Sequence, residues 1–209
     1  GGRGIRKRPG TGGICVQIQN AHKIPAVPHV LCRGFDTTET EEFLVEMVYS
    51  KIRNFFALQG DDKGYQKILK PGRKVHTYAI DLARQIRKFA ADYPLELDIA
   101  LAGYPEGHFE SSNPDIEMQF LKAKVEAARD DIDGKHSGNC YIVTQMSYDN
   151  SKILDFVNRC RASGIDVPIV VGLKILEKKN QVSMLEKMFR IEIPRELKDE
   201  VASASDEHV

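Results

Sequence analysis

The residues best suited to chemistry lie in one stretch, 101–124, which reads LAGYPEGHFESSNPDIEMQFLKAK. The mostly apolar run that leads into it, 97–102, is typical of a parallel strand covered on both faces. Four ligand-type side chains follow within seven residues: Tyr104, Glu106, His108 and Glu110. Pro114 then favours the start of a helix, where its missing N–H costs no hydrogen bond. Since ligands of α/β proteins bind at the carboxyl ends of strands, this turn is a candidate binding site.

Other predicted strands carry polar side chains at or near the same ends. His29 lies inside the strand PHVLC, where it is either a ligand or, more commonly, a satisfied core histidine. Asp61 follows LQG at a strand end, where a Gly-Asp pair either forms a turn or places a carboxylate at the binding rim. Gln145 ends the strand before SYDN and needs hydrogen-bond partners, which a polar heterocycle could supply. Together with Tyr104 and His108, these residues converge as a cofactor site on a parallel sheet requires.

Two further features are weaker signals. Lys122 and Lys124 are two residues apart on one predicted helix and therefore face different sides. One is expected to face solvent and the other to turn toward the binding rim. The glycines at 10–13 (GTGG) lack a following Gly-Lys-Ser/Thr and a preceding strand, so no phosphate loop is predicted.

The charge balance argues against several classes of partner. Lysine plus arginine equals aspartate plus glutamate at 30 each among 209 residues, so no large field favours nucleic acid or an anionic membrane. The basic start, residues 3–8, is interpreted as a solvated entry segment rather than a nucleic-acid arm. No apolar stretch reaches the ~18 residues of a membrane span. The four cysteines match neither a zinc spacing nor a redox pair, which favours buried free thiols in a cytoplasmic protein.

Predicted strands and helices alternate along the chain. The strands are expected at 26–32, 54–58, 97–102, 140–146 and 168–172. The helices are expected at 11–21, 37–51, 76–91, 115–129, 151–162, 181–189 and 195–202. Asp36 is a plausible N-cap, with Glu39 completing a capping box. Five parallel strands allow a doubly wound sheet or part of an eight-stranded barrel, which usually needs about 250 residues. The predicted organisation is an entry segment at 1–12, one α/β domain at 13–202 and a frayed tail at 203–209.

Seven segments, in their order and approximate spacing, resemble the methylenetetrahydrofolate reductase family. They are RKRPGT (6–11), PHVLCRGF (28–35), RNFFALQGD (53–61), AGYPEGHFES (102–111), LKAKVEA (121–127), YIVTQMSYDN (141–150) and NRCRASGIDVPIVVGL (158–173). The resemblance implies a TIM (β/α)8-barrel fold, with about five of the eight strands evident. It also implies an FAD-dependent oxidoreductase of one-carbon and methionine metabolism. The enzyme would take a hydride from NADH or NADPH and deliver it to 5,10-methylenetetrahydrofolate, giving 5-methyltetrahydrofolate. A homo-oligomer is expected.

The resemblance also implies a role for individual residues. The residues expected to bind the flavin are His29, Gly60, Asp61, Tyr78, Ala79, Tyr104, His108, Glu117 and Lys124. The residues expected to bind the folate are Gln145, Gln181 and Asp61. Asp61 is the expected catalytic residue, because a carboxylate at the rim stabilises a cationic iminium intermediate. A glutamine offers the pterin edge both a donor and an acceptor.

The chain departs from the family pattern at several places. Gln59, Ala123 and Val171 replace residues that are usually arginine, a basic residue and proline, and 128–139 inserts a polar loop. Segments matching the family's first, second and eighth strands are not evident, and the first carries the family's proton-donating glutamate. The shortened chain is therefore expected to show no meaningful turnover and to self-associate through open strand edges. Two interpretations remain: a reductase, or a non-catalytic flavin- or folate-binding module.

Overall fold

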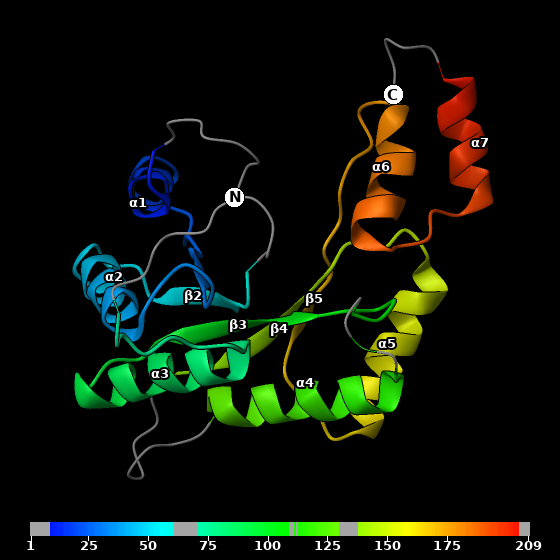
Figure 1. Cartoon of the computed structure of the whole chain (residues 1–209). Coiled ribbons are helices and arrows are strands. Elements are labelled where there is room, and N and C mark those ends of the chain that lie inside the picture. The colour runs from blue at the N-terminus through cyan, green and yellow to red at the C-terminus, as the bar shows by residue number, and fades with distance from the viewer. Residues whose placement is uncertain (1–8, 61–70, 109–110, 112, 130–137, 205–209) are drawn as a thin grey trace. The chain divides into compact units, whose positions relative to one another are not determined.

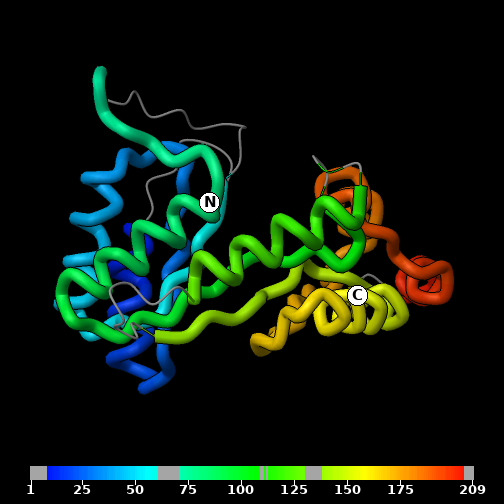
Figure 2. Tube along the Cα trace, turned by 90° about the horizontal axis from the view of Figure 1, so that it is seen from below, coloured from blue at the N-terminus to red at the C-terminus, as the bar shows by residue number. Residues whose placement is uncertain are grey.

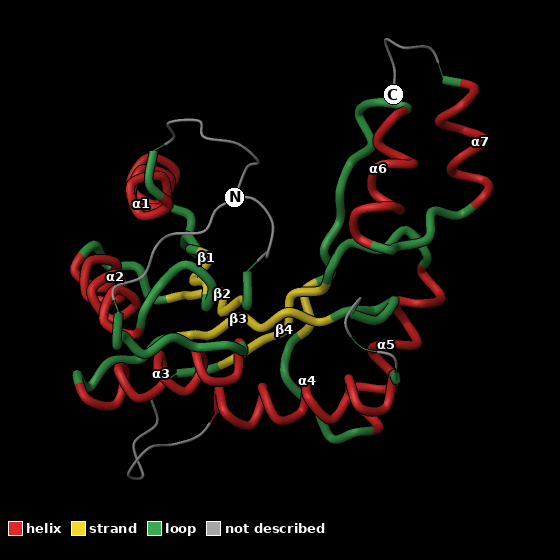
Figure 3. The backbone as a smooth tube through the Cα atoms, in the orientation of Figure 1, coloured by secondary structure: helices red, strands yellow, loops and turns green. Residues whose placement is uncertain are grey.

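The computed structural model describes residues 9–60, 71–108, 111, 113–129 and 138–204. Strands and helices alternate in this part of the chain as the sequence predicts (Figures 1 and 3). The strands are β1 (His29–Leu31), β2 (Asn54–Leu58), β3 (Asp98–Gly103), β4 (Cys140–Thr144) and β5 (Ile169–Val170). The helices are α1 (Thr11–His22), α2 (Thr37–Tyr49), α3 (Ala79–Asp92), α4 (Pro114–Arg129), α5 (Asn150–Ala162), α6 (Asn180–Phe189) and α7 (Arg195–Ser203).

The strands form one sheet in the order β1-β2-β3-β4-β5, which is also their order in the chain. β1 pairs in parallel with β2, and β2 with β3; His29 lies opposite Phe56. β4 pairs in parallel with β5, with Ile142 opposite Ile169. A doubly wound sheet reverses its strand order at a switch point, whereas a barrel keeps the order of the chain. The fold is therefore α/β of the TIM-barrel family, with five strands in the described part of the chain.

The chain divides into two compact units: Gly1–Leu101 with Ala123–Tyr141, and Ala102–Lys122 with Ile142–Val209. In the first unit, α3 packs against β2 and α2 packs against α1 and α3. Its core contains Leu44, Phe55 and Ile86, all fully buried. The predicted capping box starts α2: Asp36 Oδ1 accepts a hydrogen bond from Glu39 N at 2.8 Å, and Glu39 Oε2 accepts one from Asp36 N at 3.1 Å.

A buried arginine fixes the starts of two strands in the same unit. Arg87 lies on α3, is only 1% exposed, and its guanidinium donates to the carbonyl oxygens of Leu97 at 2.8 Å and Asn139 at 3.0 Å. Leu97 immediately precedes β3 and Asn139 immediately precedes β4. Through these two hydrogen bonds, Arg87 links α3 to the residues that precede β3 and β4. Both bonds are expected to be strong, because a charged donor makes stronger hydrogen bonds than a neutral one.

The second unit contains β5 and the C-terminal helices, whose colours run from yellow to red in Figure 2. Leu185 of α6 and the link residues Ile191 and Ile193 form a buried cluster that also packs against Leu197 of α7. Gly103 ends β3 at a close approach: a Cβ there would lie 2.7 Å from Ile142 Cγ2 and from Phe156 Cζ. No described helix is long and apolar enough to cross a bilayer.

Candidate functional site

The turn after β3 brings together three of the predicted flavin residues. The rings of Tyr104 and His108 lie edge to face, with centroids 4.6 Å apart and planes at 75°. Gly107 allows the turn by adopting a φ of +87°, and its N–H donates to the carbonyl of Tyr104 at 3.1 Å. Glu117, on the first turn of α4, accepts a hydrogen bond from His108 N at 3.1 Å. The turn therefore presents two aromatic rings and a carboxylate at the carboxyl end of a parallel strand.

Gln145 lies beside this turn, immediately after β4. Its backbone N–H donates to the carbonyl of Gly103 at 2.8 Å, next to Tyr104 in the chain. Its Oε1 accepts a hydrogen bond from Met146 N at 3.0 Å, which assigns the amide orientation. Among the described residues, none accepts a hydrogen bond from its Nε2. Gln145 therefore offers an NH₂ donor at the strand end where the sequence predicts the folate.

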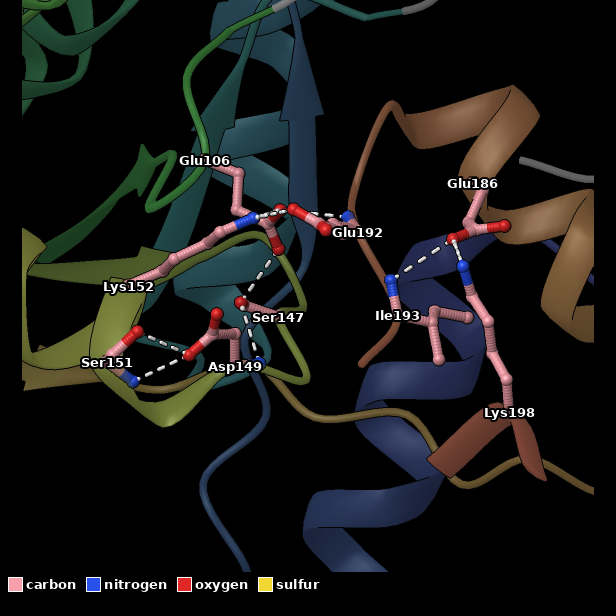
Figure 4. A network of polar contacts seen from close by, with 9 residues as sticks. All are labelled: Glu106, Ser147, Asp149, Ser151, Lys152, Glu186, Glu192, Ile193 and Lys198. Atoms are coloured by element: carbon pink, nitrogen blue, oxygen red, sulfur yellow. Dashed lines mark hydrogen bonds and ion pairs between the residues drawn. The ribbon is translucent and has the colours of Figure 1, made fainter. Parts of the chain in front are cut away.

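A network around Glu106 connects the same turn to three other segments (Figure 4). Glu106 Oε1 accepts from the Ser147 hydroxyl at 2.8 Å, and Oε2 accepts from Lys152 Nζ at 2.9 Å and Glu192 N at 2.8 Å. Lys152 also pairs with the carboxylate of Glu192 at 2.7 Å. The sequence places Glu106 in the candidate turn but does not reveal its partners, which lie 41, 46 and 86 residues away.

Gln181, the second predicted folate residue, lies at the start of α6. Its Oε1 accepts hydrogen bonds from the backbone N–H groups of Glu177 at 2.7 Å and Lys178 at 3.2 Å. The side chain thus caps the segment that enters the helix. This capping role was not predicted from the sequence.

The remaining predicted flavin residues belong to the first unit. His29 is exposed on β1, and its ring packs edge-on against Phe56 with centroids 5.0 Å apart. The exposed ring does not fit the alternative of a satisfied core histidine, and the role of His29 as a flavin residue stays a prediction. Partial burial nevertheless lowers the pKa of His29, which favours the neutral ring. Gly60 has a φ of +90°, and its carbonyl accepts from Arg33 Nη1 at 3.1 Å.

Three more of the predicted flavin residues, Tyr78, Ala79 and Lys124, belong to the first unit and lie at or within helices. Tyr78 is the N-cap of α3 and is 60% exposed, and Ala79 is the first residue of that helix. Lys124 is half-buried on α4 while Lys122 is exposed, so the two lysines face different environments as predicted. Asp61 lies outside the described residues.

The four cysteines lie within the described part of the chain, and none of them forms a disulfide there. Cys15, Cys32, Cys140 and Cys160 are buried free thiols, as the sequence predicts. Burial, and to a lesser extent Asp81, raises the pKa of Cys32 to about 12, so its reactive thiolate is disfavoured. Within the described residues, no group of three or more His, Cys, Asp or Glu side chains could hold a metal ion.

Comparison with known proteins identifies the relatives of this chain. A family model described as methylenetetrahydrofolate reductase matches residues 1–209. Methylenetetrahydrofolate reductase 1 of Schizosaccharomyces pombe is 30% identical over 200 residues, covering 94% of this chain and 30% of the yeast protein. The 5,10-methylenetetrahydrofolate reductase of Pectobacterium carotovorum is 28% identical over 188 residues, covering 90% of this chain and 56% of that protein. The chain therefore spans about a third to about half of the length of these relatives.

A solved structure has the same fold. It is an uncharacterized protein from Clostridium thermocellum that binds two copies of 5-methyl-5,6,7,8-tetrahydrofolic acid. The TM-score is 0.51 at 16% identity, with 91% of this chain and 59% of that chain covered. The structural likeness supports the fold, and the match of the family model over the whole length supports the ancestry. The chain belongs to the methylenetetrahydrofolate reductase family.

Proposed function

We propose that this chain contributes the flavin- and folate-binding residues of a methylenetetrahydrofolate reductase. The reaction is the FAD-dependent reduction of 5,10-methylenetetrahydrofolate to 5-methyltetrahydrofolate by NADH or NADPH, in one-carbon and methionine metabolism. The observation that supports this proposal most directly is the edge-to-face contact of the Tyr104 and His108 rings at the end of β3. At the same strand end, the Gln145 N–H donates a hydrogen bond to the carbonyl of Gly103. Family membership supports the reaction class.

The chemistry of these side chains fits a flavin beside a pterin. Bound FAD would supply the hydride chemistry, and the protein the positions and the electrostatics. The edges and faces of Tyr104 and His108 suit contact with a planar aromatic ring. Gln145 keeps an NH₂ donor for an acceptor atom on the pterin. The proposed flavin residues are His29, Gly60, Asp61, Tyr78, Ala79, Tyr104, His108, Glu117 and Lys124.

The folate side has its own proposed contributions. Gln145 and Gln181 are proposed to bind the substrate, and Asp61 is proposed to stabilise positive charge that develops on it. Residues 13–202 are proposed as one catalytic domain, between an entry segment at 1–12 and a tail at 203–209. Four buried free thiols support a reducing, cytoplasmic location. A homo-oligomer is also proposed, because β1 and β5 lie at the two edges of the sheet in the described part of the chain and strand edges favour self-association.

The proposal is tested by supplying FAD, NADH or NADPH, and 5,10-methylenetetrahydrofolate to the full-length gene product. Formation of 5-methyltetrahydrofolate, measured by mass spectrometry, is the expected result. The same assay on this 209-residue chain is expected to show FAD binding. The proposal is contradicted if the full-length gene product forms no 5-methyltetrahydrofolate and neither it nor the 209-residue chain binds FAD.

A second candidate function is binding of flavin or folate without turnover. It is favoured by the solved structure of similar fold that binds a methylated tetrahydrofolate. Equilibrium dialysis with 5-methyltetrahydrofolate, combined with the product assay above, separates the two functions. Saturable binding by a full-length gene product that forms no product supports the second candidate.

A further inference from the structure

The strongest unassigned feature of the second unit is the carboxylate of Glu106. It accepts hydrogen bonds from the loop after β4, from the first turn of α5 and from the link between α6 and α7 (Figure 4). Its side chain is only 7% exposed, whereas that of its partner Lys152 is 31% exposed. One side chain in the candidate turn therefore fixes three segments that are distant in sequence.

This arrangement specifies geometry more than it adds stability. Taking a carboxylate out of water is costly, and an apolar side chain of similar size often stabilises a fold as well as a buried ion pair does. The three donors, from Ser147, Lys152 and Glu192, approach the carboxylate from defined directions and so fix the position of the Glu106 side chain and backbone. Lys152 extends this effect, because its ammonium bridges Glu106 and Glu192.

The fixed segments are those that carry the proposed ligand-binding residues. Glu106 lies two residues after Tyr104 and two before His108, and Ser147 lies two residues after Gln145. We propose that Glu106 is a positioning residue, which holds the Tyr104–His108 pair and the Gln145 loop in the arrangement that binds ligand. It acts through these neighbours and contacts neither flavin nor folate. This inference rests on the proposed function for its ligand and on the contacts above for its geometry.

The test replaces the carboxylate by a side chain of the same shape, in the purified 209-residue chain. In Glu106→Gln, one amide atom still accepts from Ser147, but the other carries hydrogens toward the Lys152 and Glu192 donors. FAD affinity, measured by fluorescence quenching, is expected to fall about tenfold, which corresponds to ~1.4 kcal/mol. The side-chain proton resonances of Tyr104 and His108 are expected to shift in the same variant, without added FAD. Glu106→Asp keeps the charge and is expected to recover part of both properties.

Glu186→Gln is the matched control. Glu186 also accepts from a lysine, Lys198 at 2.7 Å, and from a backbone N–H of the same link, Ile193 at 3.2 Å. It does not lie in the candidate turn. If Glu106 acts by positioning, Glu186→Gln changes FAD affinity by less than about twofold and leaves both rings unshifted.

Equal losses of FAD affinity in Glu106→Gln and Glu186→Gln would overturn the inference. A looser segment between α6 and α7, which both glutamates contact, would then explain both losses. Unchanged ring resonances in Glu106→Gln would also overturn it. If the unmodified chain binds no FAD, the proposed function fails at this point. The positioning role is then decided by the ring resonances alone, which report the turn whether or not FAD is bound.

Discussion

At the scale of single residues, ligand binding depends on which atoms the candidate side chains leave without an internal partner. The Oε1 of Gln145 already accepts a hydrogen bond from the backbone N–H of Met146, so the group that remains for a ligand is the Nε2 donor. Gln181 likewise uses its Oε1 on two backbone N–H groups. Both proposed folate residues therefore present amide donors, which requires acceptor atoms on the ligand.

Two substitutions of Gln145 test this donor directly. Gln145→Glu keeps an acceptor for Met146 N but replaces the donor by an oxygen, and Gln145→Ala removes both. Each is expected to weaken folate binding by about 1–3 kcal/mol, because a polar contact is lost or turned repulsive. FAD retention should change less, and titration calorimetry of each variant with both ligands measures the difference. Folate binding by Gln145→Glu at the original affinity would show that the NH₂ group has no role.

The candidate site was predictable from the sequence where its members follow the ends of predicted strands, as Tyr104 and Gln145 do. The strand-turn-helix pattern was enough to place Tyr104 and His108 in one turn, whereas Glu117 was assigned to the same site by the family resemblance. The partners of Glu106 could not be predicted, because Ser147, Lys152 and Glu192 reach it through tertiary folding. A serine after a strand and a lysine on a helix are ordinarily solvated, and Glu192 contacts Glu106 through its backbone N–H, so the residue types gave no signal.

At the scale of elements, sequence periodicity predicted every strand and helix in the described part of the chain, and the differences lie at the ends. β4 was predicted to reach residue 146 but ends at Thr144, because Gln145 takes the N–H of Met146 with its own side chain. β5 was predicted to reach Gly172 but ends at Val170; the Gly172 N–H donates to Thr144 Oγ1 at 2.9 Å instead of to a strand backbone. β1 was predicted from Ala26 but begins at His29, since Pro28 has no N–H to pair.

Arg87 makes a prediction about how α3 holds the strand entries. Arg87→Met fills similar volume but leaves the carbonyls of Leu97 and Asn139 without their charged donor. The free energy of unfolding should fall by about 2–4 kcal/mol, as expected when two charge-assisted hydrogen bonds are removed. The control on the same helix is Arg84→Met, whose exposed pair with Asp81 is expected to contribute under ~1 kcal/mol. Urea unfolding of both variants gives the comparison, and similar losses would mean that Arg87 has no special role.

Gly103 makes a second prediction at this scale. An alanine Cβ would overlap Ile142 and Phe156, so Gly103→Ala should destabilise the chain by about 1–3 kcal/mol. Gly13→Ala in α1 is the control, because nothing lies within 4 Å of the position that its Cβ would take. That helical substitution should be neutral or stabilising by up to ~1 kcal/mol. Thermal unfolding of the pair decides the point; a tolerated Gly103→Ala would contradict the tight packing at the end of β3.

At the scale of the whole molecule, the second unit should be sensitive to acid. Hydrogen bonds from Ser151 lower the pKa of Asp149, and those from Lys198 and Ile193 lower the pKa of Glu186. A carboxylate with a lowered folded-state pKa stabilises the fold above its unfolded value of about 4. This contribution is lost as the pH falls through the lower, folded-state value.

The acid prediction can be measured by unfolding the chain at a series of pH values. Stability is expected to decrease below about pH 4, and Glu186→Gln should make that decrease shallower. An acid transition that is the same in Glu186→Gln and in the unmodified chain would contradict the assignment.

The central claim is that residues at the strand ends of this chain, Tyr104 and His108 among them, bind FAD. The most direct measurement is titration of FAD fluorescence with the purified 209-residue chain and with a variant that lacks both rings, Tyr104→Ala with His108→Ala. Saturable quenching by the unmodified chain is expected, with at least about tenfold weaker quenching by the double variant, since two ring contacts are lost. Equal quenching by both proteins, or none by the unmodified chain, would contradict the flavin site.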